Sequence, residues 1–308
     1  MDSLTIVTVA FNNTDLLAKN IDFIKRNSGG IKIKFIVVNN NKEPLYLNTT
    51  ESGIELLDNK SESFVGDGAE SYHHASALNF AINRFINSHY LLIMDPDFFI
   101  IYPSWGKDIL SHMEKSNLSF IGAPWHPRYY SKYRYFPSVQ CLFIDLTKVE
   151  KSSLDFTPDI NLVPIRKRLA LKFIKYKRIY NRLIIGTSRD TGYRIFRRYA
   201  HDRKIKSECF NPGIEKYDFS VVDRFLPDLV RYFPSKKNYV IHKDFLNDYY
   251  ITNGSLRNCE QFYWNQQPWG FHLRRFGNAL DGNKQVDLSV IQSVLDRGFG
   301  NQLLFNKK

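Results

Sequence analysis

Residues 90–97 read Tyr-Leu-Leu-Ile-Met-Asp-Pro-Asp, an apolar run followed at once by two carboxylates. A short apolar run without polar alternation is typical of a strand that is buried on both faces of a parallel sheet. Because side chains alternate along a strand, Asp95 and Asp97 can point the same way, about 6 to 7 Å apart along the chain. Pro96 would end the strand, since proline cannot donate to a sheet ladder. We therefore expect both carboxylates at the lip of a sheet.

Apolar strands alternate with amphipathic helices on both sides of this run. Leu4–Phe11 and Ile31–Val38 are predicted strands, and Thr14–Arg26 between them carries apolar residues at helical spacing. The alternation continues with predicted helices over Tyr72–Ile86 and Trp105–Lys115 and predicted strands over Ser119–Ala123 and Gln140–Ile144. This order predicts an α/β fold with a mostly parallel central sheet flanked by helices.

The ligand crevice of such a sheet lies beyond the carboxyl ends of its strands. Asn12, Asn39 and the pair Asp95 and Asp97 follow predicted strand ends and should converge there. Two hard oxygen donors suit Mg²⁺ or Mn²⁺, which binds through one or two carboxylates together with substrate phosphates and would neutralise a diphosphate leaving group. The alternative is that Asp-Pro-Asp is an ordinary turn sequence. Against it, the flanking apolar residues make two unpartnered carboxylates costly.

Composition excludes several classes of protein. With 308 residues, 43% of them hydrophobic, the chain can bury one large α/β core, alone or with an appendage. The sequence has neither the basic and apolar regions of a signal peptide nor an apolar stretch of the roughly 18 to 20 residues that a membrane-spanning helix needs. Cys141, Cys209 and Cys259 are unclustered, which argues against a disulfide framework or a cysteine-rich zinc site. We expect a cytoplasmic protein, at most peripheral at the inner face of the membrane.

The net charge of +12 is concentrated in one segment. Residues 164–206 carry fifteen Lys or Arg against Asp190 and Asp202, a net of +13, which leaves −1 for the rest of the chain. Within this segment, Arg166–Arg182 interleaves apolar residues at helical spacing. Such a helix can lie on an anionic membrane, which would suit an acceptor built on a lipid diphosphate. The alternatives are a solvated helix with a core-facing apolar side, or nucleic-acid binding, for which no recognised motif is present.

Three segments resemble the family 2 type GT-A glycosyltransferases. Thr5–Asn12 is similar to their opening strand, Ala75–Ala81 to their Ala-x-Ala-x-Asn helix, and Leu92–Asp97 to their metal-binding strand end. The likeness covers about residues 4–125. It implies a GT-A fold, a nucleotide-sugar donor and single displacement with inversion at the anomeric carbon.

The resemblance also implies roles for individual residues. It assigns a Mn²⁺ or Mg²⁺ ion to Asp95 and Asp97. It places around the donor Phe11, Asn12, Asn39, Asn79, Asp95 and Arg274. The family usually has an Asp at the end of the second strand, where this chain has Asn39 followed by Asn40, so the base of the nucleotide is left open.

Asp190 lies 93 residues beyond Asp97, at about the distance where the family places its catalytic carboxylate. We predict that Ser188 caps a helix running through Tyr199, with Asp190 in its first turn. The helix dipole and nearby cations would keep this carboxylate ionised, so that it could take a proton from an acceptor hydroxyl as general base. The alternative is an acidic residue that stabilises a first helical turn and nothing more.

A third metal ligand in GT-A enzymes is often a His near the carboxyl end. Trp269–Arg275 resembles the family's late His-Leu-x-Arg stretch, which makes His272 the expected ligand and Arg274 or Arg275 a phosphate contact. His242, at the end of a short apolar run, is the other candidate.

Together these patterns predict a nucleotide-sugar-binding half over residues 1–150 and a helical, acceptor-binding half over 151–308, with the basic helix and a C-terminal closure. The predicted function is a metal-dependent glycosyltransferase acting on a glycan or lipid-linked acceptor, in surface polysaccharide or glycoconjugate synthesis. Trp125 and Trp269 are either platforms for sugar stacking or core residues. One alternative is a sugar nucleotidyltransferase, which would need a Gly-rich loop where residues 11–14 read Phe-Asn-Asn-Thr. The other is a non-enzymatic module that binds a membrane or nucleic acid.

Overall fold

The computed structural model describes residues 3–11, 14–41, 43–47, 53–59, 69–126, 132–133, 135–159, 190–214, 240–241 and 259–273. Its helices are α1 (Thr14–Arg26), α2 (Ala69–Phe85), α3 (Trp105–Lys115), the 3₁₀ turn η1 (Lys151–Ser153) and α6 (Tyr193–Tyr199). Its strands are β1 (Ser3–Ala10), β2 (Lys32–Asn39), β3 (Ile54–Asp58), β4 (Tyr90–Met94), β5 (Phe98–Ile100), β6 (Phe120–Pro124), β7 (Pro137–Asp145), β8 (Ser207–Cys209), β9 (Asn211–Ile214), β10 (Val240–Ile241), β11 (Glu260–Trp264) and β12 (Gln267–His272). The basic helix predicted over Arg166–Arg182 lies outside the described residues.

The central sheet has the order β3-β2-β1-β4-β7-β6-β8. Neighbours are parallel throughout except at β7, which runs antiparallel to both β4 and β6. The strands β1, β2 and β4 are buried along most of their length, as their continuous apolar runs require. The predicted α/β class and mostly parallel sheet are confirmed.

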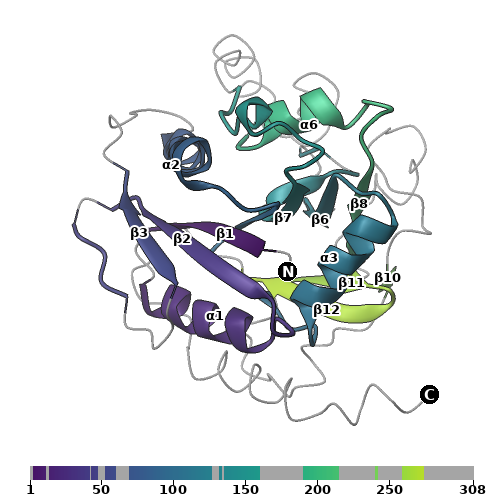
Figure 1. Cartoon of the computed structure of the whole chain (residues 1–308), viewed down its shortest axis with the longest axis horizontal. Helices are drawn as coiled ribbons and strands as arrows, with labels where there is room; N and C mark the ends of the chain where they lie inside the picture. The colour runs from purple at the N-terminus through teal and green to yellow at the C-terminus, as the bar shows by residue number, and fades with distance from the viewer. Residues whose placement is uncertain are drawn as a thin grey trace, which may run out of the picture.

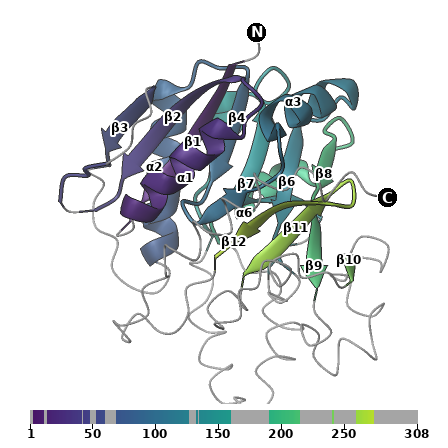
Figure 2. The same cartoon turned by 90° about the horizontal axis from the view of Figure 1, so that it is seen from below.

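A second sheet was not expected, and within the described residues its five strands have the order β10-β9-β11-β12-β5. It draws β5 from the middle of the chain and pairs it antiparallel with β12, about 170 residues later. Figure 2 shows β9, β10, β11 and β12 grouped together beside the first sheet. A strand of three residues such as β5 gives almost no periodic signal, which is why sequence patterns missed it.

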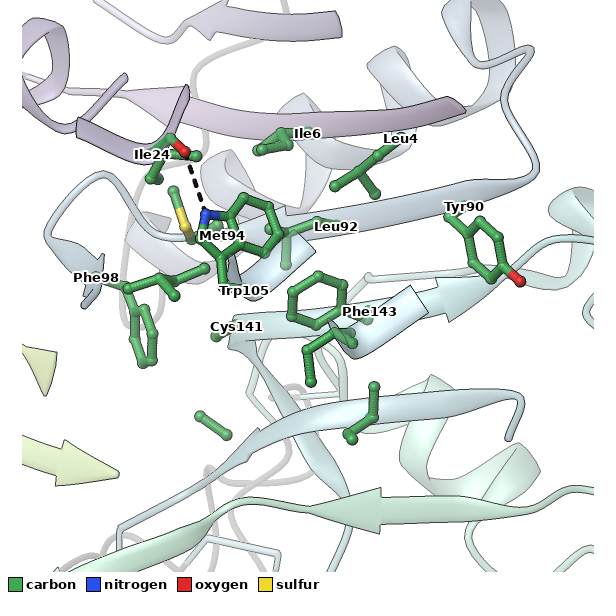
Figure 3. Packing of buried hydrophobic residues seen from close by; sticks show 14 of the residues in the cluster. Leu4, Ile6, Ile24, Tyr90, Leu92, Met94, Phe98, Trp105, Cys141 and Phe143 are labelled. Carbon is green, nitrogen blue, oxygen red and sulfur yellow. Dashed lines mark hydrogen bonds between the residues drawn. The ribbon is translucent and has the colours of Figure 1, made fainter. Parts of the chain in front are cut away.

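Helices cover both faces of the central sheet, with α1 and α2 on opposite sides of β1 and β2 (Figure 1). One buried cluster lies under α1 and α3, and another lies under α2 and α6. Trp105 is fully buried in the first cluster, where its Nε1 donates to the backbone oxygen of Ile24 at 3.1 Å (Figure 3). Losing a buried ring of this size typically costs about 3 to 5 kcal/mol. These two buried clusters, one on each face of the central sheet, fix the strands β1, β2 and β4 so that their carboxyl ends lie at the same edge of that sheet.

Candidate metal and donor site

The Asp-Pro-Asp segment is a tight turn between strands of the two sheets. Asp95 follows β4 directly, and its backbone N–H donates to Gln140 O on β7 at 3.0 Å. The backbone N–H of Phe98, the first residue of β5, donates to Asp95 O at 3.1 Å. The segment is thus both a turn, as the alternative interpretation held, and the lip of the central sheet.

Asn20 holds this turn in place from α1. Its side chain is fully buried, and Nδ2 donates to Pro96 O at 3.0 Å and to Phe98 O at 2.9 Å. A buried amide that satisfies two carbonyls of a turn fixes the path of the backbone there. Sequence patterns gave no sign of this role, because a lone Asn on the inner side of a helix is compatible with many contacts.

His272 reaches the turn through the pairing of β12 with β5. It lies opposite Phe98 in the ladder, and the next backbone N–H, of Leu273, donates to Asp97 O at 3.0 Å. His272 Nε2 lies 3.2 Å from Asp97 Oδ1 and 3.7 Å from Asp95 Oδ2. Residues 175 positions apart in the chain therefore meet in one cluster, and the predicted trio is brought together.

Two further side chains border this cluster, and sequence patterns had singled out neither. His74, on α2, places Nε2 3.7 Å from Asp95 Oδ1, whereas His272 approaches the other oxygen, Oδ2. Glu260, the first residue of β11, has no exposed surface and lies directly opposite His272 across the β11–β12 ladder. Its Oε2 is 3.3 Å from His272 Nδ1. A carboxylate at the start of a largely aromatic strand was the one signal available.

The charges in the cluster influence one another strongly. Burial raises the pKa of the Asp95 carboxyl, and the nearby His74 and His272 side chains offset part of that rise. Burial alone would lower the pKa of His272, but Asp97 and Glu260 hold it well above its usual range. Among the described residues of this cluster, three carboxylates (Asp95, Asp97 and Glu260) lie beside two imidazoles (His74 and His272), an arrangement that suits a bound cation.

The side chains present fit a divalent cation. Asp95, Asp97 and His272 each offer one ligand atom, and these atoms lie within 4.8 Å of one another. Carboxylate oxygens suit Mg²⁺ and Mn²⁺, and an added imidazole nitrogen is common for Mn²⁺ and other transition metals. The other His candidate, His242, lies outside the described residues.

Asp190 lies just before α6, and the prediction that it belongs to the first turn of this helix is wrong. The helix begins at Tyr193, and its N-cap is Gly192, which has a left-handed φ of 80°. The predicted cap, Ser188, lies outside the described residues. A glycine in that backbone conformation turns the chain sharply, which leaves Asp190 in the preceding loop.

Asp190 is held by an ion pair with Lys132 rather than by a helix dipole. The Lys132 ammonium also lies 4.5 Å from the centre of the Trp125 ring. Thr191 ties this loop to α2, because its hydroxyl donates to Ser71 O at 3.1 Å. Burial alone would raise the pKa of Asp190, but Lys132, together with hydrogen bonds from Ser71 and Thr191, brings the pKa below its ordinary value. The predicted base is thus ionised, and it is close enough to Asp95 to raise the pKa of that carboxyl.

The residues predicted around the donor have differing surroundings. Phe11, directly after β1, is 47% exposed and accessible to a ligand. Asn39 is buried, and its Nδ2 donates to Glu43 O at 2.9 Å and to Asp58 Oδ1 at 3.0 Å. Asn12 and Arg274 lie outside the described residues. The predicted donor contacts of all four remain predictions.

Asn79 anchors the segment that follows η1. Its Nδ2 donates to Thr157 Oγ1 at 3.1 Å, and its Oδ1 accepts from the backbone N–H of Phe156 at 3.0 Å. A contact with the donor therefore stays a prediction for this residue as well. Two tryptophans were considered as platforms for sugar stacking. Trp269 has no exposed surface and is a core residue, whereas Trp125 is partly exposed beside Lys132.

Solved glycosyltransferases are among the structures to which the chain is similar. Galactosyltransferase LgtC, in complex with donor and acceptor sugar analogues, is 13% identical, with a TM-score of 0.42 over 78% of this chain and 87% of that one. The mannosyltransferase PcManGT from Pyrobaculum calidifontis, in complex with GDP-Man and Mn²⁺, is 12% identical, with a TM-score of 0.34 over 48% and 46%. S. aureus TarS 1-349, in complex with UDP-GlcNAc, is 11% identical, with a TM-score of 0.34 over 51% and 48%.

The chain therefore spans about half the length of the mannosyltransferase and of TarS. Identities and TM-scores this low do not decide function. No protein-family model matches the sequence, and no curated protein matches it. Among the helices that the structure describes, none has the length and apolar character needed to cross a bilayer.

Proposed function

We propose that this protein is a metal-dependent glycosyltransferase that moves a sugar from a nucleoside-diphosphate sugar to an acceptor hydroxyl. The observation that carries the proposal is the meeting of Asp95, Asp97 and His272 at the carboxyl edge of the central sheet. Nothing in the packing of an α/β core requires two carboxylates and an imidazole to be partly buried together, and grouping them is costly without a cation.

The three side chains would hold Mn²⁺ or Mg²⁺. When bound, such an ion neutralises the negative charge of a diphosphate leaving group. The chain's own contribution is to hold the ligands rigidly. Asn20 fixes the Asp95–Phe98 turn, and the β5–β12 pairing fixes His272 beside it. Preorganisation of this kind supplies much of the rate enhancement of many enzymes, because the charges need not rearrange during reaction.

Asp190 is the proposed general base. Its lowered pKa keeps the carboxylate ionised, so it can accept a proton from the acceptor hydroxyl as that oxygen attacks the anomeric carbon. Attack on the face opposite the diphosphate would invert the anomeric configuration. Lys132 is paired with Asp190, so the acceptor must compete with its ammonium for the carboxylate.

The proposed acceptor is a glycan or a lipid-linked precursor in surface polysaccharide or glycoconjugate synthesis. Support comes from residues 164–206, whose +13 net charge would attract an anionic acceptor or the headgroups of a membrane. The sugar nucleotidyltransferase alternative lacks support, because residues 11–14 contain no Gly-rich phosphate loop.

The proposal is tested by replacing Asp97 with Asn. This change keeps the side-chain size but removes one negative charge from the cation site. We expect Mn²⁺ to raise the melting temperature and the affinity for UDP or GDP in the wild type. In Asp97→Asn, the Mn²⁺ affinity should fall by at least the roughly 10- to 100-fold that is usual for losing an outer partner of a metal site.

Isothermal titration of UDP and GDP, with and without Mn²⁺, measures how far Mn²⁺ raises the nucleotide affinity of each protein. Asp202→Asn, at an exposed carboxylate after α6, is the matched control and should bind like the wild type. Nucleotide binding by the wild type that ignores Mn²⁺ would contradict the metal assignment. A transfer product with retained anomeric configuration would contradict single displacement.

A further inference from the structure

The β11 strand places a carboxylate where an apolar side chain would be cheaper. Glu260 has no exposed surface, and the rest of its strand is largely aromatic and buried. Moving an ionised carboxylate out of water costs several kcal/mol unless good partners compensate, and an apolar residue of similar volume is often at least as stable. Stability of the sheet alone therefore does not explain a Glu at this position.

The geometry around Glu260 points to the His272 ring instead. The two residues face each other in the antiparallel ladder, so their side chains stand on the same face of the second sheet. Glu260 Oε2 lies 3.3 Å from Nδ1, while Asp97 Oδ1 lies 3.2 Å from Nε2 on the opposite side of the ring. Phe98 stacks on the ring, with centroids 6.2 Å apart and planes 27° apart. The ring is thus held at both nitrogens and on one face.

We infer that Glu260 is a positioning residue that keeps the Nδ1 proton of His272 in place, so that Nε2 is left free to bind the cation. A neutral imidazole carries one proton, and the hydrogen bond at one nitrogen decides which nitrogen can act as a ligand. Carboxylate partners of this type orient metal-binding His residues and increase their basicity. This inference rests on the proposed metal site and adds the residue that selects its imidazole tautomer.

The same fold contains a matched comparison pair. Glu208 on β8 lies 2.9 Å from Nε2 of His112 on α3, so it is also a carboxylate beside a His. This pair borders Trp264 rather than the Asp95–Asp97 turn. Glu208→Gln therefore makes the same chemical change as Glu260→Gln, but beside His112, which is not a proposed metal ligand.

The test measures Mn²⁺ affinity without relying on activity. Titration followed by the electron paramagnetic resonance of free Mn²⁺ should show a roughly 10- to 100-fold weaker affinity in Glu260→Gln, the usual range for such partners. Glu208→Gln should bind Mn²⁺ like the wild type. Equal affinity in the wild type and Glu260→Gln would overturn the inference and leave the metal site standing, whereas no Mn²⁺ binding by the wild type would overturn both.

A second measurement needs no variant and therefore covers the case in which Glu260→Gln does not fold. In wild type loaded with Mg²⁺, ¹⁵N-correlated NMR of the His side chains reports which ring nitrogen of His272 carries the proton. We expect a proton on Nδ1 and none on Nε2. A proton on Nε2 in the loaded protein would overturn the inference.

Discussion

At the scale of single residues, the charge state of Asp190 depends on Lys132. Burial opposes ionisation of the carboxylate, but the Lys132 ammonium and hydrogen bonds from Ser71 and Thr191 together outweigh it, so the pKa in the folded protein is depressed. Because the pKa is depressed, the stability that this carboxylate contributes is fully present above its unfolded-state pKa and is lost as the pH falls through its folded-state pKa. Lys132→Met should raise the pKa of Asp190, because burial then acts unopposed by this cation. The acid limb of kcat/KM for sugar transfer should move to higher pH.

The pH profile of transfer by wild type and Lys132→Met measures this shift. Lys148→Met is the matched control, since Lys148 forms a comparable ion pair with Asp145 Oδ2 at 2.9 Å. It should leave the acid limb in place. An acid limb at the same pH in all three proteins would show that Asp190 is not the group whose ionisation controls transfer.

At the scale of elements, the site depends on how closely β12 approaches β5. A Cβ added to Gly270 would lie 2.4 Å from Phe99 O, so only glycine allows the two backbones to pair at this distance. Gly270→Ala should push β12 away from β5 and carry His272, two residues further on, away from Asp97. We expect a loss of stability of about 1 to 3 kcal/mol, the usual cost of overpacking. Mn²⁺ affinity should weaken as well, as measured by titration.

Gly213 on β9 gives the control in the same sheet. A Cβ added there would meet the Tyr263 ring edge at 3.0 Å, a side-chain contact that can adjust more easily than a backbone oxygen. Gly213→Ala should therefore be less destabilising and should leave Mn²⁺ affinity unchanged. If Gly270→Ala binds Mn²⁺ as tightly as the wild type, the β5–β12 pairing does not position the ligand.

At the scale of the whole molecule, the distribution of charge should control binding to surfaces. Residues 164–206 carry a net +13 in a chain whose total is +12. Each Lys or Arg near an anionic surface contributes about 1 kcal/mol, and screening becomes strong as the Debye length falls to about 3 Å near 1 M salt. We expect the protein to bind phosphatidylserine-containing vesicles at low salt and to be released at high salt, as measured by co-sedimentation.

Changing four cations of residues 164–206 to Gln should weaken vesicle binding. The four are Lys172, Lys175, Arg178 and Arg182. The control removes the same charge elsewhere, at four exposed side chains, Arg26, Lys32, Lys107 and Lys115. It should bind vesicles nearly as well as the wild type. Equal weakening by both sets would mean that net charge alone acts, and failure of the wild type to bind would contradict the membrane proposal.

Much of this protein was determined by local patterns in its sequence. The strands β1, β2 and β4 and the helices α1 and α3 lie within a residue or so of their predicted bounds, because buried strands and amphipathic helices leave a repeat in the order of apolar residues. The position of Asp95 and Asp97 at the lip of the sheet follows from the same patterns.

Only the tertiary structure decided which distant residues complete the site. His272 was one of two candidates for the third metal ligand. It meets Asp97 because β12 pairs with β5, a strand about 170 residues earlier in the chain. Glu260, His74 and Lys132 came to light only in the folded chain, where each contacts a predicted residue. The spacing of apolar residues indicates whether a residue is buried, because burial follows the local pattern of its strand or helix. It does not report which strand edges pair, because that depends on the free energy of the whole packed core.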